Sequence, residues 1–176
     1  MKAHSIAHII VAALLLLPAS LPGQARESTA PLPLSAEPRT LIPMLAGTWH
    51  FNIYSSGNTH PVSSGQRVMR LLGDSMKLAW TETFVGRADT GTGVFGYSSV
   101  TGAYYVFGAY TDETDPFVLT GRFDGSGNTI LFDPLEGLDR GGNLVASSLR
   151  LIDPQHFEWI ASSGRWRAVF TRVGNS

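Results

Sequence analysis

The sequence predicts an all-β protein, built as a single closed antiparallel up-and-down β-barrel of about 8–10 strands. Three observations support this class: apolar and polar residues alternate with period two, turn residues recur every roughly 8–12 residues, and the links between segments are short. Short links make neighbouring strands antiparallel, because a parallel crossover needs about a dozen residues or more. Closure follows because an open sheet of so many strands would expose two unpaired edges. A two-sheet sandwich is the alternative architecture.

Residues 1–25 have the features of a signal peptide. Lys2 opens a weakly basic start, an apolar run covers residues 9–17, and Ala25 ends a cleavage motif of small residues. The run is shorter than the about 20 residues of a membrane helix, so we expect cleavage rather than an uncleaved anchor. Residues 26–40 are rich in proline and lack an amphipathic period, which predicts a flexible leader before the domain at 41–176. We therefore expect an exported protein, periplasmic or extracellular, and the absence of glycosylation sequons favours a bacterial source.

Composition limits the possible classes of function. The net charge of −1 argues against electrostatic capture of nucleic acid. The sequence contains no cysteine, which excludes disulfides, thiolate catalysis and a lipid-modified cysteine. Cleavage leaves about 150 residues, enough for one domain with its own core. No further apolar run approaches spanning length, so no membrane span is expected in the mature protein, and the oligomeric state stays open.

The expected strands and turns follow one another from Gly47 to the end of the chain. A short helical turn at residues 41–45, limited by Pro43, precedes them and is expected to cover one end of the barrel. Gly, Asp, Asn and Pro fill the turns, where they accept positive φ or preset the bend. The strands are expected near residues 47–54, 66–72, 76–85, 92–98, 103–110, 117–123, 129–134, 144–152, 156–162 and 166–172.

Alternation assigns the inward faces of the first and third strands. Trp49 and Phe51 share one face of the first strand, and Trp80 shares an otherwise apolar face of the third strand with Glu82. An ionised carboxylate inside a barrel is costly unless it is paired or solvated. Glu82 therefore indicates either a polar internal cavity or a strand end that reaches water.

The fifth strand carries apolar or aromatic residues on both faces. Tyr105 and Phe107 lie on one face, and Tyr104 and Val106 lie on the other. Tyrosine hydroxyls inside a barrel often hold the polar end of a ligand. The same rings pointing outward and packing under loops are an equal alternative.

Two terminal motifs are similar to the calycin pattern, the pattern of the superfamily that includes lipocalins and fatty-acid-binding proteins. These motifs are Leu45-Ala46-Gly47-Thr48-Trp49 and Phe170-Thr171-Arg172. The segments 93–97, 104–106, 111–112 and 119–124 further resemble a bacterial family of secreted calycin-like proteins of unknown function, over about residues 41–173.

The resemblance implies a calycin-like barrel in which Arg172 of the last strand covers Trp49 of the first. It implies no activity. Two departures weaken any transfer of a ligand: Phe107 and Tyr110 stand where a Trp is expected, and residues 133–140 form a loop elaboration.

The sequence contains no convincing motif for catalysis, a metal or a cofactor. A Gly-x-Ser-x-Gly elbow is absent, and His50, His60 and His156 form no ligand pair, so we interpret them as surface or loop residues. Residues 124–128 imitate the start of a calcium loop but lack its Gly and Glu, which favours a hairpin turn. Residues 91–96 match Gly-x-Gly-x-x-Gly without a following helix, so we interpret these glycines as relieving crowding or forming bulges in a bent strand.

The leading hypothesis is a non-enzymatic binding protein that holds a small apolar or amphipathic ligand in the barrel, where aromatic walls exclude water. The residues expected to line this site are Trp49, Phe51, Trp80, Glu82, Tyr105 and Phe107. One alternative is a barrel filled by its own side chains that acts as a structural or protein-interaction module. A third is an enzyme, which requires a His or Arg near Glu82. Glu82→Leu is expected to leave a dry core unchanged or slightly more stable, and to impair binding if Glu82 holds a ligand.

Overall fold

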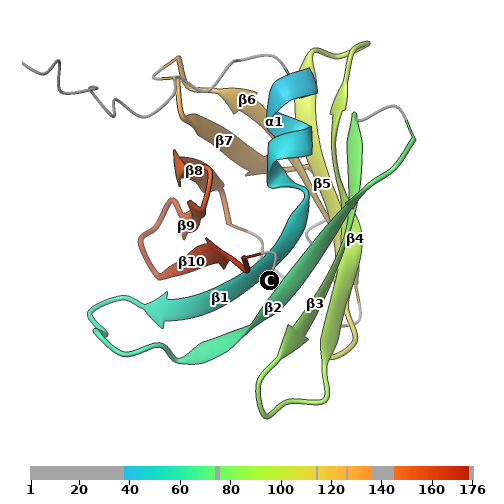
Figure 1. Ribbon diagram of the computed structural model, residues 1–176. Coiled ribbons are helices and arrows are strands. Elements are labelled where there is room, and N and C mark those ends of the chain that lie inside the picture. Colours follow the sequence, from blue (N-terminus) through green and yellow to red (C-terminus); the bar gives the residue numbers. More distant parts are fainter. Residues whose placement is uncertain (1–37, 74–75, 114, 126, 136–144, 175–176) are drawn as a thin grey trace, which may run out of the picture.

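The computed structural model describes residues 38–73, 76–113, 115–125, 127–135 and 145–174. Within these ranges ten strands form one closed antiparallel barrel, in which each strand pairs with the next and β10 pairs with β1 (Figure 1). This confirms the predicted fold class and excludes the two-sheet sandwich. The strands are β1 (Gly47–Ser55), β2 (Ser63–Leu71), β3 (Lys77–Phe84), β4 (Thr90–Ser98), β5 (Ala103–Tyr110), β6 (Phe117–Phe123), β7 (Thr129–Pro134), β8 (Ser147–Asp153), β9 (His156–Ala161) and β10 (Trp166–Arg172).

One short helix, α1 (Pro38–Leu45), precedes the barrel in the described part of the chain. It begins inside the expected leader, because a proline in the first helical turn lacks only an N–H that would have no partner there. The rest of the expected leader and the expected signal peptide lie outside the described residues. The helix buries Leu41, Ile42 and Leu45 completely. Among the described residues no helix has the length and apolar character needed to cross a membrane.

The helix lies across one end of the barrel, which we call the helix end. Figure 1 shows α1 at the end where β4 turns into β5, whereas the β1–β2 and β3–β4 hairpins point away from it. Because the strands alternate in direction, the connections β1–β2, β3–β4, β5–β6 and β9–β10 lie at the opposite end, which we call the far end.

Trp49 joins the helix to the barrel wall. Its indole Nε1 donates a hydrogen bond to the Leu45 carbonyl at 2.9 Å, and its ring meets Phe157 edge-on with centroids 4.7 Å apart. The Arg172 guanidinium lies over the same ring, 4.2 Å from the centroid. Trp49 therefore closes the helix end of the barrel with a large, fully buried ring.

Arg172 also ties the end of α1 to β10. Its guanidinium donates hydrogen bonds to the carbonyls of Met44 and Ala46, the latter at 2.7 Å. These carbonyls lie at the helix C-terminus, where a cation is favourable. Gly47 makes the approach possible, because its φ is 134° and a Cβ there would lie 2.5 Å from Arg172 Nη1.

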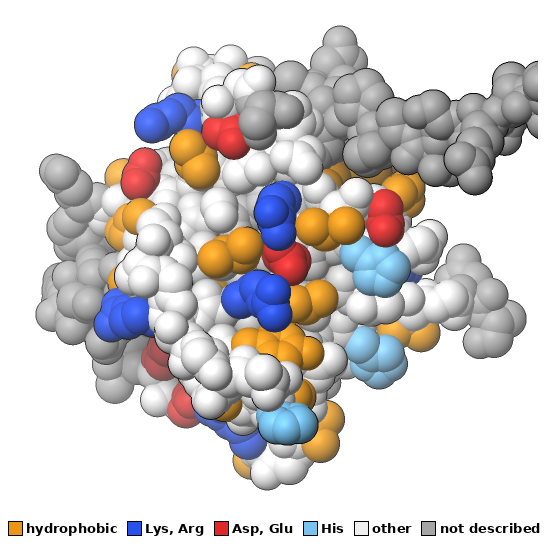
Figure 2. Space-filling view, turned by 90° about the vertical axis from the view of Figure 1, so that its left-hand side faces the viewer, with side chains coloured by type: hydrophobic (Ala, Val, Ile, Leu, Met, Phe, Trp, Pro, Cys, Tyr) orange, Lys and Arg blue, Asp and Glu red, His pale blue; other side chains and the backbone are white. Residues whose placement is uncertain are grey.

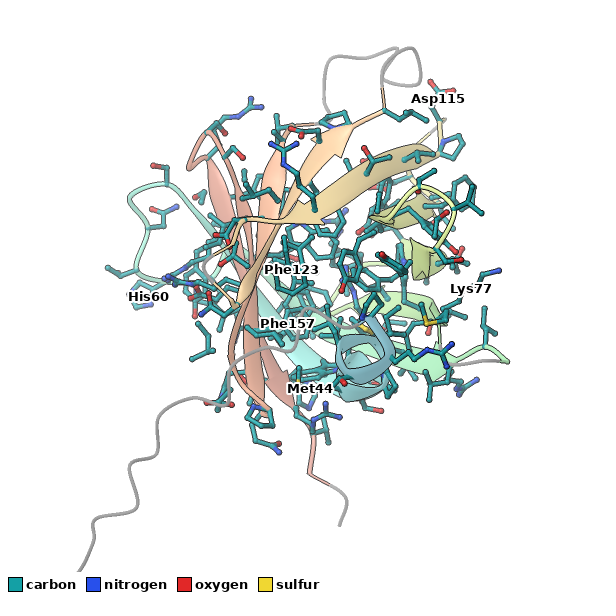
Figure 3. The ribbon with its side chains drawn as sticks, turned by 90° about the horizontal axis from the view of Figure 1, so that it is seen from above. Met44, His60, Lys77, Asp115, Phe123 and Phe157 are labelled. Carbon is teal, nitrogen blue, oxygen red and sulfur yellow. The ribbon has the colours of Figure 1, made fainter. Side chains whose placement is uncertain are left out.

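The interior of the helix-end half is solidly packed. Figure 3 shows Phe123 and Phe157 inside the barrel, and His60, Lys77 and Asp115 at its periphery. Aromatic rings meet in close pairs, such as Phe157 with Phe170 at 4.3 Å between centroids. The buried residues of this half include Leu78, Phe95, Tyr104, Ile130, Phe132, Leu149 and Phe157.

Candidate functional site

A cavity of about 400 Å³ occupies the far-end half of the barrel. Its wall is mainly aromatic and aliphatic, with a few polar groups. The residues that line it are Phe51, Ile53, Arg67, Trp80, Glu82, Phe84, Val106, Tyr110, Glu113, Phe117, Leu119, Val145, Ser147, Trp159, Trp166, Ala168 and Phe170. Residues closer to α1 on the same strands do not line the cavity, so the packed helix-end core forms its floor.

Glycines in β4 and β5 make room for the largest ring in this wall. The Trp80 indole lies against the backbone at Gly91, Gly93 and Gly108, and a Cβ at Gly93 would lie 2.5 Å from its Cζ2 atom. A side chain at these positions would push the indole toward the centre of the cavity. Gly91 and Gly93 of the Gly-x-Gly-x-x-Gly stretch therefore relieve crowding, which is one of the two roles that the sequence suggested for these glycines.

A buried ion pair crosses from β2 to β3 inside the barrel. Arg67 Nε donates to Glu82 Oε1 at 2.7 Å, and Arg67 Nη2 lies 2.6 Å from the same oxygen. The two residues are directly opposite in the strand register, and they are 8% and 3% exposed. Glu82 is thus paired inside the barrel and does not mark a strand end that reaches water.

Tyr110 completes the polar cluster from β5. Its hydroxyl donates to Glu82 Oε2 at 2.8 Å, so each carboxylate oxygen accepts a hydrogen bond. Burial, with the nearby Glu82 charge, raises the pKa of Tyr110 well above its ordinary value. The hydroxyl therefore stays protonated and keeps donating to the carboxylate. We call Arg67, Glu82 and Tyr110 the polar cluster.

The guanidinium of Arg67 is also held by aromatic rings. Its Cζ atom lies 5.0 Å from the ring centroid of Trp80, 5.5 Å from that of Trp159 and 4.8 Å from that of Phe170. Such cation–π contacts stabilise a desolvated cation by about 2 kcal/mol or more in favourable cases. The rings and Glu82 together fix where the positive charge lies in the cavity wall.

The structure brings three of the six expected lining residues to this cavity, namely Phe51, Trp80 and Glu82. Trp49 lies beyond the cavity floor, where it closes the helix end. Tyr105 and Phe107 are on the outer face of β5, and Phe107 is 46% exposed.

The outward position of Tyr105 and Phe107 corrects the expectation that they line the site. Both faces of β5 are apolar, so alternation alone did not identify the inward one. The inward residues are Tyr104 and Val106, and Val106 lines the cavity.

Arg67 is the main site residue that the sequence reasoning did not find. A signal for it existed in the hairpin that joins β2 to β3. The pairs Leu71 with Leu78, and Met69 with Trp80, lie at equal steps from the turn, and the next inward step pairs Arg67 with Glu82. The strands expected at residues 66–72 and 76–85 already leave a turn between them, so counting equal steps from that turn would have predicted the ion pair.

The far-end rim carries a second charged group. Arg87 of the β3–β4 connection binds Asp89 and also reaches Asp112 in the β5–β6 connection, with Nη2 and Oδ2 3.0 Å apart. Its guanidinium lies 4.9 Å from the ring centroid of Phe84, which lines the cavity. Beside it, Glu113 also lines the cavity, and partial burial, followed by the charge of Asp112, raises its pKa.

The histidines lie outside the cavity. His50 and His60 are exposed, and His156 binds Asp153 through Nδ1 at 2.9 Å, which lowers the pKa of that carboxyl. Figure 2 shows histidines gathered toward one side of an outer face on which hydrophobic and charged side chains alternate. Over the described ranges, no three His, Cys, Asp or Glu side chains lie close enough together to hold a metal ion.

The hairpin at residues 124–128 is described except for residue 126. Gly125 and Gly127 have φ of 84° and 96°, values typical of a tight turn. Asn128 donates its amide to the Leu151 carbonyl at 3.1 Å. The side chain thus links the β6–β7 turn to β8.

The enzyme alternative required a His or Arg near Glu82, and Arg67 meets that geometric condition. Both carboxylate oxygens are already engaged, by Arg67 and by Tyr110. Ser147, a hydroxyl in the described wall, accepts a hydrogen bond from Trp159 Nε1 at 2.9 Å. These contacts place a polar anchor within an aromatic wall.

Fold and site together define a closed antiparallel β-barrel with an internal cavity, which is compatible with a calycin-like fold. Neither a protein-family model nor a curated protein sequence matches the chain.

Proposed function

We propose that this protein is a non-enzymatic binding protein that holds a small apolar or amphipathic ligand inside its barrel. The observation that carries the proposal is the cavity of about 400 Å³ with an aromatic wall around a buried polar cluster. Cavities for small molecules typically measure about 300–1,000 Å³ and combine apolar walls with a few placed polar groups. The filled-barrel alternative accounts for the helix-end half of the interior but not for the far-end half.

The cavity wall favours binding by exclusion of water. Each Å² of apolar surface that a ligand buries contributes about 25 cal/mol, and rigid rings lose little conformational entropy when they contact a ligand. Tyr110 and Phe117, with ring planes 18° apart, form a flat stretch of this wall. The polar cluster then fixes the orientation of a ligand that has a polar end.

The proposed setting of this function is outside the cytoplasm. The signal-peptide features of residues 1–25 support export to a periplasm or the extracellular space. The resemblance to secreted bacterial calycin-like proteins supports the same setting and is part of the proposal.

Two measurements test the proposal. Native mass spectrometry of protein isolated from its exporting cell, before and after mild organic extraction, is expected to show a defined extra mass that extraction removes. For protein stripped in this way, the neutral fluorescent probe N-phenyl-1-naphthylamine is expected to bind with one saturable site. A stripped, folded protein that takes up neither the extracted material nor the probe would contradict the proposal.

A matched pair of substitutions locates the bound probe. Ala168 is buried and lines the cavity, whereas Ala109 lies on the outer face of β5. Ala168→Phe fills part of the cavity and is expected to abolish probe binding, and Ala109→Phe is expected to leave it unchanged. If both variants lost probe binding equally, or if both kept it, the probe would bind elsewhere than in the cavity.

A further inference from the structure

We propose that the ligand is an uncharged amphipathic molecule whose hydrogen-bonding head group contacts the polar cluster, and that free carboxylic acids and amines are excluded. This inference rests on the proposed function, since it names the class of ligand for the same cavity. The inference follows from the balance of positive and negative charge in the cavity wall.

Arg67 and Glu82 neutralise each other within the cavity. Their atoms approach to 2.6 Å, both side chains are at least nine-tenths buried, and Tyr110 binds the second carboxylate oxygen. A buried Arg without a partner would attract an anionic head group. A buried Arg whose charge is already matched offers a ligand dipoles and hydrogen-bonding sites, but no net charge.

A charged head group would meet opposing forces at this cluster. A carboxylate that approaches Arg67 also approaches Glu82, and an ammonium that approaches Glu82 also approaches Arg67. Either ion would lose its hydration on entering the cavity. Its interaction with the existing ion pair would offset only part of that desolvation free energy. An ion could recover more only by displacing one partner, which would leave the other partner buried with its charge unmatched.

An uncharged head group avoids this conflict. A carboxylate has about four lone-pair positions and a guanidinium has five N–H donors, so each can accept or donate beyond the bonds of the pair. The Tyr110 hydroxyl donates to Glu82 and its oxygen can still accept. A hydroxyl, carbonyl or amide can therefore bind at the cluster without any net charge entering the barrel.

Glu113 is the remaining charged residue of the described wall, and it strengthens the selection against acids. It lies at the far end, in the connection that leads from β5 to β6, and its side chain is solvent-exposed. Its carboxylate repels an anion at the entrance, although water and salt screen this effect. An exposed rim carboxylate does not compensate a cation at the buried cluster.

A ligand series with one alkyl chain and three head groups tests the inference. Decan-1-ol, decanoate and decylammonium are each titrated against wild-type protein loaded with N-phenyl-1-naphthylamine near neutral pH. Decan-1-ol is expected to displace the probe, and each ion is expected to require about tenfold or more higher concentration, which corresponds to about 1.4 kcal/mol. Tightest binding of decanoate or decylammonium would overturn the inference while the proposed function stands. A folded protein that binds neither the probe nor any of the three would instead contradict the proposed function.

A charge substitution gives a second, independent readout. Glu82→Gln keeps the shape of residue 82 and an acceptor oxygen for Arg67, and its NH2 group can donate to the Tyr110 oxygen in place of the bond that Tyr110 donates in the wild type. The substitution leaves the Arg67 charge unmatched, so the affinity for decanoate is expected to rise about tenfold or more relative to that for decan-1-ol. Glu158→Gln is the matched control, since Glu158 is paired with Arg150 on the outside of the barrel, and it should keep the wild-type ranking. An unchanged ranking in folded Glu82→Gln would overturn the inference. Should that variant fail to fold by circular dichroism, the wild-type series decides alone.

Discussion

At the scale of single residues, the ion pair with Arg67 changes the expected effect of substituting Glu82. The alternation of β3 identified Glu82 as the one charged residue on an apolar inward face. Considered without a partner, this carboxylate predicts that Glu82→Leu leaves the stability of a dry core unchanged or slightly higher. Because Arg67 lies 2.6 Å away, the substitution instead leaves a buried guanidinium without its counter-charge.

We therefore expect Glu82→Leu to lower the free energy of unfolding by about 3–5 kcal/mol, the typical cost of removing one partner of a buried ion pair. Arg67→Met combined with Glu82→Leu should recover most of this loss, because neither charge is then left in the barrel. Urea unfolding of the wild type, both single variants and the double variant measures the coupling. Additive costs in the double variant would show that the two side chains do not depend on each other.

A second residue-scale prediction concerns the space beneath Trp80. Gly93→Ala places a methyl group against the Phe107 carbonyl oxygen and 2.5 Å from Trp80 Cζ2, and is expected to cost about 1–3 kcal/mol of stability through overpacking. Gly174→Ala serves as the control, because no atom lies within 4 Å of its Cβ position. Urea midpoints of the two variants should differ clearly. Equal midpoints would mean that the β5 backbone and the indole both move aside without cost.

At the scale of elements, strand positions were predictable and strand faces only partly so. Period two and turn residues located the strands, with β2 beginning at Ser63 and so three residues earlier than expected. The apolar–polar contrast that identifies an inward face exists in β3 but not in β5, where Phe107 lies outside and Val106 inside. The cavity itself depends on how side chains from eight strands fill the far end, and no local sequence pattern predicts that volume.

The contact between β10 and α1 carries the element-scale prediction. Arg172→Met removes the hydrogen bonds to the α1 carbonyls and the guanidinium over Trp49, and is expected to cost about 1–3 kcal/mol of stability. Arg70→Met, at an exposed position of β2, should stay within about 0.5 kcal/mol of the wild type.

Hydrogen exchange followed along the chain distinguishes a local effect from a global one. Loss of Arg172 should speed exchange first in α1 and in β1 near Trp49, because these segments depend directly on its contacts. Uniform acceleration across all strands would contradict a special role for this residue at the helix end.

At the scale of the whole molecule, the barrel divides into a packed half and a hollow half, and buried tyrosines lie in both. Tyr104 lies in the packed half, and its hydroxyl has no hydrogen-bond partner among the described residues. Tyr110 lies in the hollow half, bound to Glu82. Burial is the main cause that raises the pKa of both phenols, and a neighbouring ionisable group adds to it, Tyr97 for Tyr104 and Glu82 for Tyr110.

This arrangement predicts an alkaline limit to stability. A tyrosine in the unfolded chain ionises near pH 10, whereas Tyr104 and Tyr110 in the barrel keep their protons to higher pH. The stability contributed by these raised pKa values is complete below about pH 10 and is lost as the pH rises above it, because the unfolded state then releases protons that the folded state retains. Each of the two tyrosines lowers the free energy of unfolding by at most about 1.4 kcal/mol per pH unit in that range.

Urea midpoints measured between about pH 8 and pH 11 test this, together with tyrosinate absorbance. We expect the midpoint to fall steeply above about pH 10, with part of the absorbance change appearing only when the barrel unfolds. Tyr104→Phe removes one of the two groups together with its unpartnered hydroxyl, so the fall should be shallower and the stability near neutral pH equal or higher. Tyr110→Phe should also make the fall shallower, but it should lower stability near neutral pH, because Glu82 loses a hydrogen bond. The same alkaline slope in both variants as in the wild type would contradict the linkage, since the pH dependence would then arise from other groups.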